Sequence, residues 1–222
     1  SAAKHGVILS QVQLDLATML KRKDQVVSQL TMGIAGLFKK SKIEHLHGKG
    51  KLLSPTQVEV TADGGAAQIH NAKKIILASG SEPASLPTAP FDGKRIISST
   101  EALILSAVPK NLIVIGGGAI GLEMGSVWLR LGAKVTVIEF QDRIVPTADQ
   151  QASRELQKIL TKQGFEFKLS TKVMSAKNDG AVVTVEVEDA AGTGKKETLK
   201  AEYVLVAIGR KPNNPGPDLR DA

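Results

Sequence analysis

A glycine-rich segment in the middle of the chain has the residue types of a phosphate-binding turn. Residues 116–121 read Gly116, Gly117, Gly118, Ala119, Ile120 and Gly121, which fits the pattern G-x-G-x-x-G. In this pattern the first glycine allows a tight turn, the second lets the backbone approach a pyrophosphate, and the third lets helix and strand pack closely. A helix that begins here would offer unpaired N–H groups and a partial positive charge to phosphates. The segment therefore predicts a dinucleotide site.

An acidic residue follows at the spacing that such a site needs. Glu139 follows the predicted strand 134–138 and lies 18 residues beyond Gly121. A carboxylate there accepts hydrogen bonds from both ribose hydroxyls and repels a 2′-phosphate, which predicts a preference for NAD over NADP. Arg143 is the opposing indication, because a nearby arginine can serve a 2′-phosphate. The competing interpretation is a glycine-rich turn with a surface glutamate at a strand end.

The other candidate residues carry weaker signals. Glu123 is equally well explained as a first-turn glutamate favoured by the helix dipole. The chain contains no cysteine, which excludes disulfides, thiolate nucleophiles and cysteine-ligated metals. No metal site is predicted, because the histidines have no metal-ligand helix spacing and no carboxylate or cysteine lies near the closest pair; they are His5, His45, His47 and His70.

The elements around the glycine segment alternate between strand and helix. Strands are predicted over 111–115, 134–138, 165–169 and 203–208, of which the first and the last are apolar runs. Helices are expected over 122–131 and from a cap at Thr147 to about Gln163, and a β-hairpin over 181–188 and 197–203. This order predicts an α/β fold, a Rossmann-like parallel sheet with crossover helices and a β-hairpin or meander.

The first third of the chain has a different pattern. A capping box at Ser10 and Gln13 predicts a long amphipathic helix to about Lys40 with an apolar core stripe. Short strands are expected over 43–47, 51–53, 57–61 and 67–70, with a turn at 63–65. The run 74–78 predicts a strand buried on both faces. Three prolines at 83, 87 and 90 indicate a domain boundary, and a second capping box, Ser98 with Glu101, opens a short helix.

Composition indicates a globular protein of 222 residues with 42% hydrophobic and 23% charged residues. No apolar run is long enough to cross a membrane. The net charge of +7 can attract phosphates, but no aromatic residue interleaves with the lysine clusters 39–42 and 195–200, so nucleic acid is not an expected partner. The N-terminus has neither a signal peptide nor an Arg-rich presequence, and it does not begin with methionine, so we expect a processed chain or a piece of a longer one.

Long stretches of the sequence resemble the dihydrolipoamide dehydrogenase family of FAD- and NAD-linked pyridine nucleotide-disulfide oxidoreductases. The resemblance extends from about Gly6 to Asn213. It depends on KIILASGSEP at 74–83, SSTEAL at 98–103, the run 111–140, QGFEFKLSTKV at 163–173 and VLVAIGRKP at 204–212. The sequence GSVW at 125–128 favours this member over glutathione or mercuric reductases.

The resemblance implies two cofactors. Residues 1–81 would be the later part of an FAD-binding domain, 82–213 an NAD-binding domain, and 214–222 a stub that leads back to the FAD domain. NAD would contact the residues of the glycine loop together with Leu122, Glu139, Val173 and Gly209, and Glu123 would lie near the nicotinamide. FAD would contact Gly50, Ser79, Gly80 and Ser81; the serine at 79 replaces the usual threonine and keeps the hydroxyl.

The resemblance also implies an activity and partners. The family oxidises dihydrolipoamide through a redox disulfide and FAD, and passes hydride to NAD. It serves 2-oxo-acid dehydrogenase complexes, such as the pyruvate dehydrogenase complex, through their lipoyl domains. We expect a homodimer for the full-length protein and a location in the bacterial cytoplasm or the mitochondrial matrix.

Several family features have no counterpart in these residues. The first flavin-binding glycine motif, the Cys-x4-Cys pair, the dimerisation domain and the His–Glu acid/base pair are missing. We therefore expect the middle of a longer polypeptide, with no catalytic residue in this part and no thiol–disulfide exchange by this part alone. The alternatives are a stand-alone dinucleotide-binding module without catalysis and a related disulfide reductase.

Overall fold

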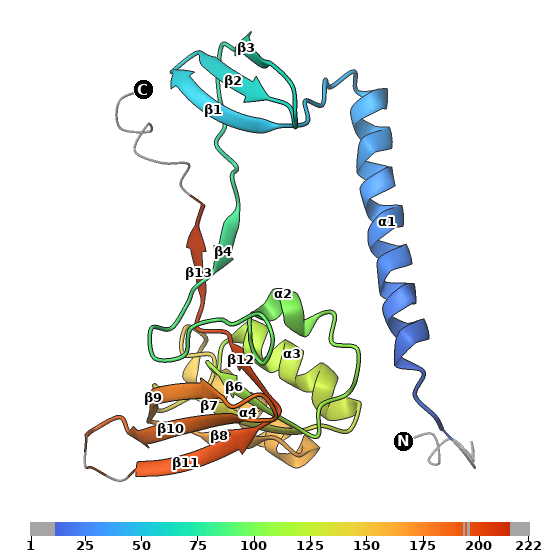
Figure 1. Cartoon of the computed structure of the whole chain (residues 1–222). Helices are drawn as coiled ribbons and strands as arrows, with labels where there is room; N and C mark the ends of the chain where they lie inside the picture. Colours follow the sequence, from blue (N-terminus) through green and yellow to red (C-terminus); the bar gives the residue numbers. More distant parts are fainter. Residues whose placement is uncertain (1–11, 193, 195, 214–222) are drawn as a thin grey trace. The chain divides into compact units, whose positions relative to one another are not determined.

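The computed structural model describes residues 12–192, 194 and 196–213 (Figure 1). By its contacts the described chain divides into two units. Residues 12–20 and 83–210 form the first unit, and residues 21–82 and 211–213 form the second. In the described residues, no helix is both long and apolar enough to span a bilayer.

A five-stranded parallel sheet is the centre of the first unit. Its order is β5 (Ile96–Ile97), β12 (Tyr203–Val206), β6 (Asn111–Ile115), β7 (Lys134–Ile138) and β8 (Glu166–Lys168). Helix α3 (Ala119–Arg130) connects β6 to β7, and α4 (Gln150–Gln163) lies between β7 and β8. The predicted α/β fold with crossover helices is confirmed.

An antiparallel sheet forms the second layer of this unit. Its order is β11 (Lys196–Ala201), β10 (Val183–Asp189) and β9 (Thr171–Asn178). The predicted hairpin corresponds to β10 and β11, whereas β9 was not predicted. The sequence of β9 has few apolar residues, and only Val173 and Ala176 are buried, so its pattern gives a weak strand signal.

Core residues cover both faces of the parallel sheet. Alternate residues of each strand point to opposite faces, so neighbouring residues belong to different clusters. Leu112 and Val114 of β6 belong to a core cluster with Leu122 and Trp128 of α3. Their neighbours Ile113 and Ile115 belong to the cluster formed by the valines of β10. This two-sided burial explains why the strand has a continuous apolar sequence.

The short helix α2 (Ser99–Ala102) has the predicted capping box. The Ser98 hydroxyl accepts the Thr100 N–H, and the Glu101 carboxylate accepts the Ser98 N–H at 2.8 Å. The Trp128 indole N–H donates to the Ala102 carbonyl at 3.1 Å, which joins α2 to α3.

We expect the stabilising effect of Glu101 to depend on pH. The hydrogen bond from the Ser98 hydroxyl lowers the pKa of Glu101; partial burial opposes this effect and the Ser98 N–H adds to it. Because the folded-state pKa lies below the unfolded-state value, the stabilisation is fully present above the unfolded-state pKa and is lost as the pH falls through the folded-state pKa. The variant Glu101→Gln should therefore unfold about 1 kcal/mol more easily than the wild type at neutral pH. Urea denaturation at a series of pH values should show this difference shrinking in acid; a difference independent of pH would contradict the assignment.

The second unit contains most of α1 (Leu16–Lys40) and a three-stranded antiparallel sheet. The sheet has the order β1 (Lys49–Ser54), β2 (Gln57–Thr61) and β3 (Ala67–Asn71), with the predicted turn at 63–65 between β2 and β3. A two-stranded ribbon pairs β4 (Ser81–Pro83) with β13 (Arg210–Pro212).

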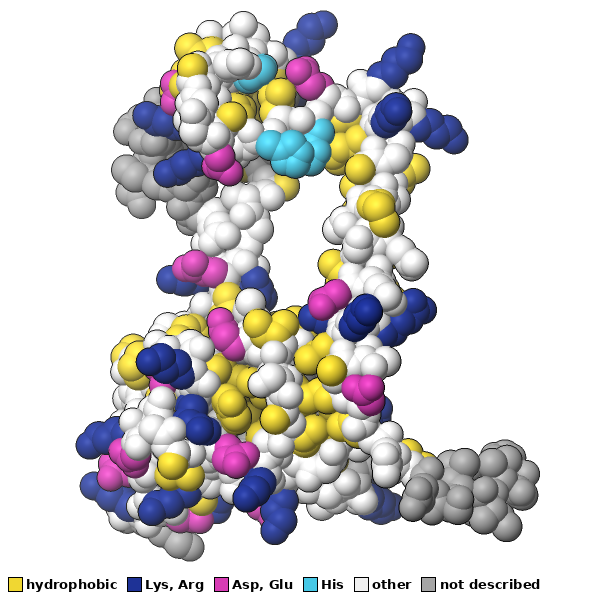
Figure 2. Space-filling model, turned by 45° about the vertical axis from the view of Figure 1, so that its right-hand side comes forward, with side chains coloured by type: hydrophobic (Ala, Val, Ile, Leu, Met, Phe, Trp, Pro, Cys, Tyr) yellow, Lys and Arg dark blue, Asp and Glu magenta, His cyan; other side chains and the backbone are white. Residues whose placement is uncertain are grey.

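Several predictions for the first third of the chain are wrong. Helix α1 begins at Leu16, with Asp15 accepting the Thr18 N–H, and not near Gln13; Ser10 lies outside the described residues. Most of the stripe predicted as core is exposed, as Figure 2 shows along α1: Val27, Leu30, Ile34 and Leu37 are exposed and Leu16 and Leu20 are half-buried. No residue of α1 is fully buried. Amphipathic spacing indicates which face of a helix can be buried, but that face is buried only where another element packs against it.

Two predicted strands are also wrong. Residues 43–47 and 74–78 form no strand, and the Ile76 side chain is 90% exposed. A strand requires a hydrogen-bonded neighbour, and the described part of the chain pairs none with either segment. In the first unit, Asp149 rather than Thr147 caps α4, because its carboxylate accepts the N–H groups of Gln151 and Ala152.

Candidate functional site

The glycine turn joins the end of β6 to the start of α3. Gly116 has a φ of +108°, and a Cβ atom there would lie 2.5 Å from the Ala207 carbonyl oxygen. A Cβ atom on Gly121 would meet the Gly116 carbonyl oxygen and would lie 2.9 Å from a Val114 methyl group. The protein itself therefore requires glycine at both positions.

Gly118 differs from these two glycines. It is the N-cap of α3 with extended backbone angles, φ −78° and ψ 178°, which any residue can adopt. A Cβ atom there would have no neighbour within 4 Å in the described structure. No side chain caps this helix end in the described residues, so the first amide groups of α3 are available to an anion.

Glu139 lies directly beyond β7 and is buried, with 9% of its surface exposed. One carboxylate oxygen accepts the Gly117 N–H at 2.6 Å, and the other accepts the Gln141 N–H at 2.8 Å. A carboxylate has about four acceptor positions, so these two bonds fix its orientation and leave capacity for ligand hydroxyls.

A cavity of about 990 Å³ opens over this end of the parallel sheet. That volume is near the upper end of the roughly 300–1,000 Å³ range of ligand pockets, as an extended ligand would need. Seven of the predicted NAD residues line it: Gly116, Gly118, Ala119, Ile120, Glu139, Val173 and Gly209.

The other four predicted NAD residues do not line the cavity. Gly117 supports Glu139 from behind through its N–H group. Gly121 and Leu122 are buried, and Leu122 belongs to the core cluster of α3. Glu123 is exposed on α3, one residue further along.

Sequence reasoning missed the loop that forms one wall of the cavity. This loop lies between β7 and α4, and its lining residues are Phe140, Gln141, Val145, Pro146, Thr147 and Ala148. The sequence shows only a connection there, and no motif marks its residues. Thr171 and Lys172 at the start of β9 were missed because that strand was missed.

Arg143 lies in this loop but does not line the cavity. Its guanidinium donates to the Pro146 carbonyl at 3.0 Å and lies 3.9 Å from the Asp142 carboxylate. The side chain is thus engaged within its own loop, which weakens the indication of a 2′-phosphate site.

Comparison with models of known protein families matches residues 2–220 to the family described as pyridine nucleotide-disulphide oxidoreductase. The chain belongs to this family. The match includes the glycine turn, Glu139 and the strands that position them.

Individual members of the oxidoreductase family are similar to nearly the whole chain. The mitochondrial dihydrolipoyl dehydrogenase of Pisum sativum is 48% identical over 219 residues, which are 99% of this chain and 44% of the relative. Dihydrolipoyl dehydrogenase 3 of Pseudomonas aeruginosa is 49% identical over 215 residues, 96% of this chain and 45% of the relative. The crystal structure of LpdA from Mycobacterium tuberculosis matches with a TM-score of 0.84 and 27% identity, over 95% of this chain and 46% of that one. The chain thus spans less than half the length of the relatives it matches.

The four residues that were predicted to contact FAD lie in the second unit. Gly50 is in β1 and pairs with Val60. Gly80 has a φ of +76°, and its carbonyl accepts the Asn213 N–H at 2.9 Å. The Ser79 hydroxyl donates to the Asn213 carbonyl, so Asn213, which was not predicted, fixes this turn. None of the predicted FAD residues, including Ser81, lines the cavity.

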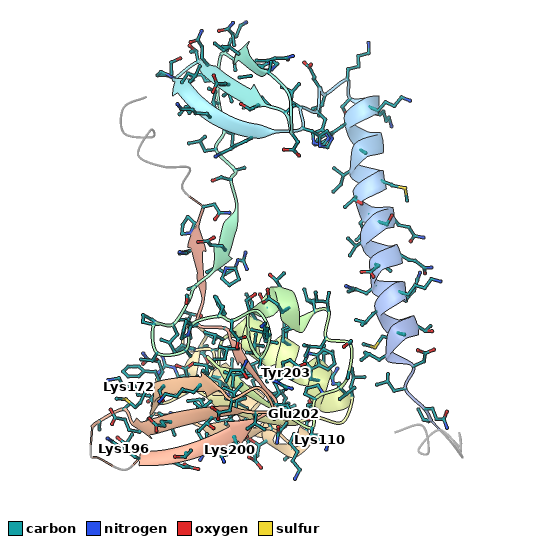
Figure 3. The ribbon with its side chains drawn as sticks, viewed as in Figure 1. Lys110, Lys172, Lys196, Lys200, Glu202 and Tyr203 are labelled. Carbon is teal, nitrogen blue, oxygen red and sulfur yellow. The ribbon has the colours of Figure 1, made fainter. Side chains whose placement is uncertain are left out.

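Charged side chains of both signs are interspersed on the first unit (Figure 2). Figure 3 shows Lys196 and Lys200 on β11 and Lys172 on β9. Lys196 and Lys172 are the cross-strand partners of Glu188. His45 and His47 have ring centroids 4.0 Å apart, and among the described residues no three potential metal ligands come together.

Proposed function

We propose that these residues form the NAD-binding core of a dihydrolipoamide dehydrogenase. The observation that carries this proposal is the cavity in which an uncapped helix end, an open position at Gly118 and the oriented carboxylate of Glu139 adjoin one another. The dihydrolipoyl dehydrogenases that are similar to 96–99% of the chain support the choice of enzyme.

In this proposal the cavity holds NAD with its diphosphate at the start of α3. The amide groups of the first helical turn neutralise the phosphate charge, and the absence of a side chain at Gly118 permits the close approach. The Glu139 carboxylate accepts hydrogen bonds from the hydroxyls of the adenosine ribose, and its negative charge repels a 2′-phosphate. Val173 and Gly209 contribute to the walls, and the exposed Glu123 lies toward the nicotinamide.

We further propose that the domains follow the predicted division. Residues 1–81 are the later part of an FAD-binding domain, 82–213 are the NAD-binding domain, and 214–222 return to the FAD-binding domain. Gly50 and the Ser79–Ser81 turn contact the flavin. The glycine with positive φ at 80 and the hydroxyl at 79 support a turn built to approach a cofactor.

When bound, a flavin would supply, together with a redox disulfide, the electron transfer from dihydrolipoamide to NAD+. This chain has no cysteine, so the disulfide must come from another part of a longer polypeptide. The matched relatives are more than twice as long as the matched region, which supports such a polypeptide. The role of the present residues is to bind and orient NAD.

Partners and location follow from the same proposal. The full-length protein acts as a homodimer on the lipoyl domains of 2-oxo-acid dehydrogenase complexes, of which the pyruvate dehydrogenase complex is one. The pea relative is named as mitochondrial and the Pseudomonas relative is bacterial, which supports the mitochondrial matrix or the bacterial cytoplasm.

Replacing Glu139 should weaken coenzyme binding. In Glu139→Ala the ribose hydroxyls lose a charged acceptor and the N–H groups of Gly117 and Gln141 lose their partner. We expect a loss of about 1–3 kcal/mol, which is roughly a 5- to 150-fold rise in the Kd for NAD+. Isothermal titration calorimetry of the two proteins measures this change. An unchanged Kd for NAD+ would refute the ribose role.

The enzyme assignment is tested on the full-length protein. Dihydrolipoamide should reduce NAD+ in its presence, with a flavin absorbance spectrum in the purified protein. Reduction of glutathione disulfide instead of activity with dihydrolipoamide would favour a related disulfide reductase. A mature protein of 222 residues that binds NAD+ without flavin would favour the stand-alone module.

A further inference from the structure

The loop that forms one wall of the cavity contains a residue in an unfavourable backbone conformation. Val145 has a φ of +38°. A β-branched residue rarely adopts positive φ, and Pro146, which follows it, also favours an extended conformation at this position. Two features of the sequence therefore oppose the observed geometry, so surrounding contacts must maintain it.

The strained residue holds the phosphate-binding turn by a hydrogen bond. The Val145 N–H donates to the Gly117 carbonyl at 2.8 Å, while the Gly117 N–H donates to Glu139 at 2.6 Å. The carbonyl of Gly117 and the N–H of Gly118 belong to one planar trans peptide, so they point in opposite directions. Fixing the carbonyl on Val145 therefore directs the Gly118 N–H away from Val145 and fixes its orientation.

Ser153 anchors the same loop from the first turns of α4. Its side chain is fully buried, with 0% exposure, and its hydroxyl donates to the Ile144 carbonyl at 2.7 Å. Helical serines commonly donate to the carbonyl four residues earlier, whereas this one reaches nine residues back. Ile144 is also 0% exposed. It lies against Gly117: a Cβ atom added to Gly117 would be 3.3 Å from a methyl group of Ile144.

We propose that Ser153 is a positioning residue for the coenzyme diphosphate. Its bond to Ile144 holds Val145 in the strained conformation, and Val145 in turn orients the Gly117–Gly118 peptide so that the Gly118 N–H is set for a phosphate oxygen. This inference rests on the proposed NAD site and adds a residue that contacts neither the cavity nor the coenzyme.

The first test replaces Ser153 by alanine in the full-length enzyme. We expect the Kd for NAD+ to rise about five- to tenfold, the effect of one hydrogen bond of ordinary strength. The Kd for ADP, which keeps the diphosphate and lacks the nicotinamide riboside, should rise by the same factor. The kcat at saturating NAD+ should stay within about twofold of wild type, because a positioned turn affects binding and not the later chemistry.

Ser175→Ala is the matched control. It also removes one serine hydroxyl, which donates from β9 to the Glu186 carboxylate on β10 at 3.0 Å, and Ser175 does not line the cavity. Its Kd values for NAD+ and ADP should stay within about twofold of wild type. If Ser153→Ala only lowers the thermal midpoint, or lowers kcat with unchanged Kd values, the positioning role is overturned.

A second pair of variants tests the strained residue without touching Ser153. Val145→Ala and Val145→Gly both remove the side chain from the cavity wall, but only glycine adopts the positive φ at this position without strain. We expect Val145→Gly to bind NAD+ and ADP about threefold more tightly than Val145→Ala, because glycine keeps the φ of +38° without strain and so keeps the Gly117–Gly118 peptide in its orientation. Equal affinities of the two Val145 variants would overturn the inference. This test remains available if Ser153→Ala does not fold.

The inference and the proposed function fail in different ways. If the wild-type protein binds no NAD+, the proposed function is wrong. If the wild type binds NAD+ and Gly118→Val does not, while Ser153→Ala binds like the wild type, the NAD site stands and only the positioning role of Ser153 falls.

Discussion

Gly118→Val is expected to abolish NAD+ binding while the protein stays folded. The glycine has extended backbone angles that valine adopts readily, and a Cβ atom there meets no protein atom within 4 Å in the described structure. The added side chain instead occupies the space over the first turn of α3, where the diphosphate is proposed to lie. We expect the Kd for NAD+ to rise by more than about 100-fold, or about 2.7 kcal/mol.

Two measurements on Gly118→Val separate binding from folding. Calorimetric titration with NAD+ gives the affinity. Thermal unfolding should show a loss of only about 1 kcal/mol, because valine is a poorer N-cap than glycine. Normal saturation with NAD+ would show that the diphosphate lies elsewhere.

Gly121→Ala is expected to have the opposite effect, a large loss of stability. Its Cβ atom would meet the Gly116 carbonyl oxygen and would come within 2.9 Å of Val114 in the centre of the sheet. Neither group is the mobile end of a long side chain, so α3 must move away from β6. We expect a loss of about 3 kcal/mol, which lowers the thermal midpoint by roughly 6–12 °C for a chain of this size.

Gly118→Ala is the matched control for this second experiment. It adds the same methyl group at the N-cap of α3, three residues earlier and in open space, and should change the thermal midpoint by less than about 4 °C. A midpoint of Gly121→Ala within the same range would mean that the helix and strand are less closely packed than the structure shows.

The contrast between these two glycines shows what a motif can and cannot indicate. The pattern G-x-G-x-x-G predicts a tight turn at Gly116, room for a pyrophosphate at Gly118 and close packing of helix and strand at Gly121. In this structure Gly116 and Gly121 are required by nearby protein atoms, whereas Gly118 faces open space. The three-dimensional surroundings add which protein atoms exclude a side chain at Gly116 and Gly121, and that none does so at Gly118 within 4 Å in the described structure.

The prediction was most successful where local pattern and burial agree. Strands β6 and β7 begin and end at the predicted residues. Strand β6 is apolar and buried from Leu112 to Ile115, and β7 buries Val135, Val137 and Ile138. The capping box of α2 was also predicted, since it involves residues only three positions apart.

The prediction failed where structure depends on distant residues. The segment 74–78 has the composition of a buried strand, yet the described chain offers it no partner. Strand β9 was missed because its neighbours, and not its own sequence, define it. The wall loop that contains Val145 carries no motif, and the hydrogen bonds that hold it come from Gly117 and Ser153, 28 residues before and eight residues after it.

The sequence by itself determined the α/β order of elements, the glycine turn between a strand and a helix, and an acid at the end of the next strand. These features are local, and each follows from residues within one strand–helix–strand unit. The tertiary structure alone decided which residues form the cavity, how the Glu139 carboxylate is oriented, and how Ser153 and Val145 fix the Gly117–Gly118 peptide. The reason is physical: hydrogen-bond direction and burial depend on groups that the fold brings together from separate parts of the chain.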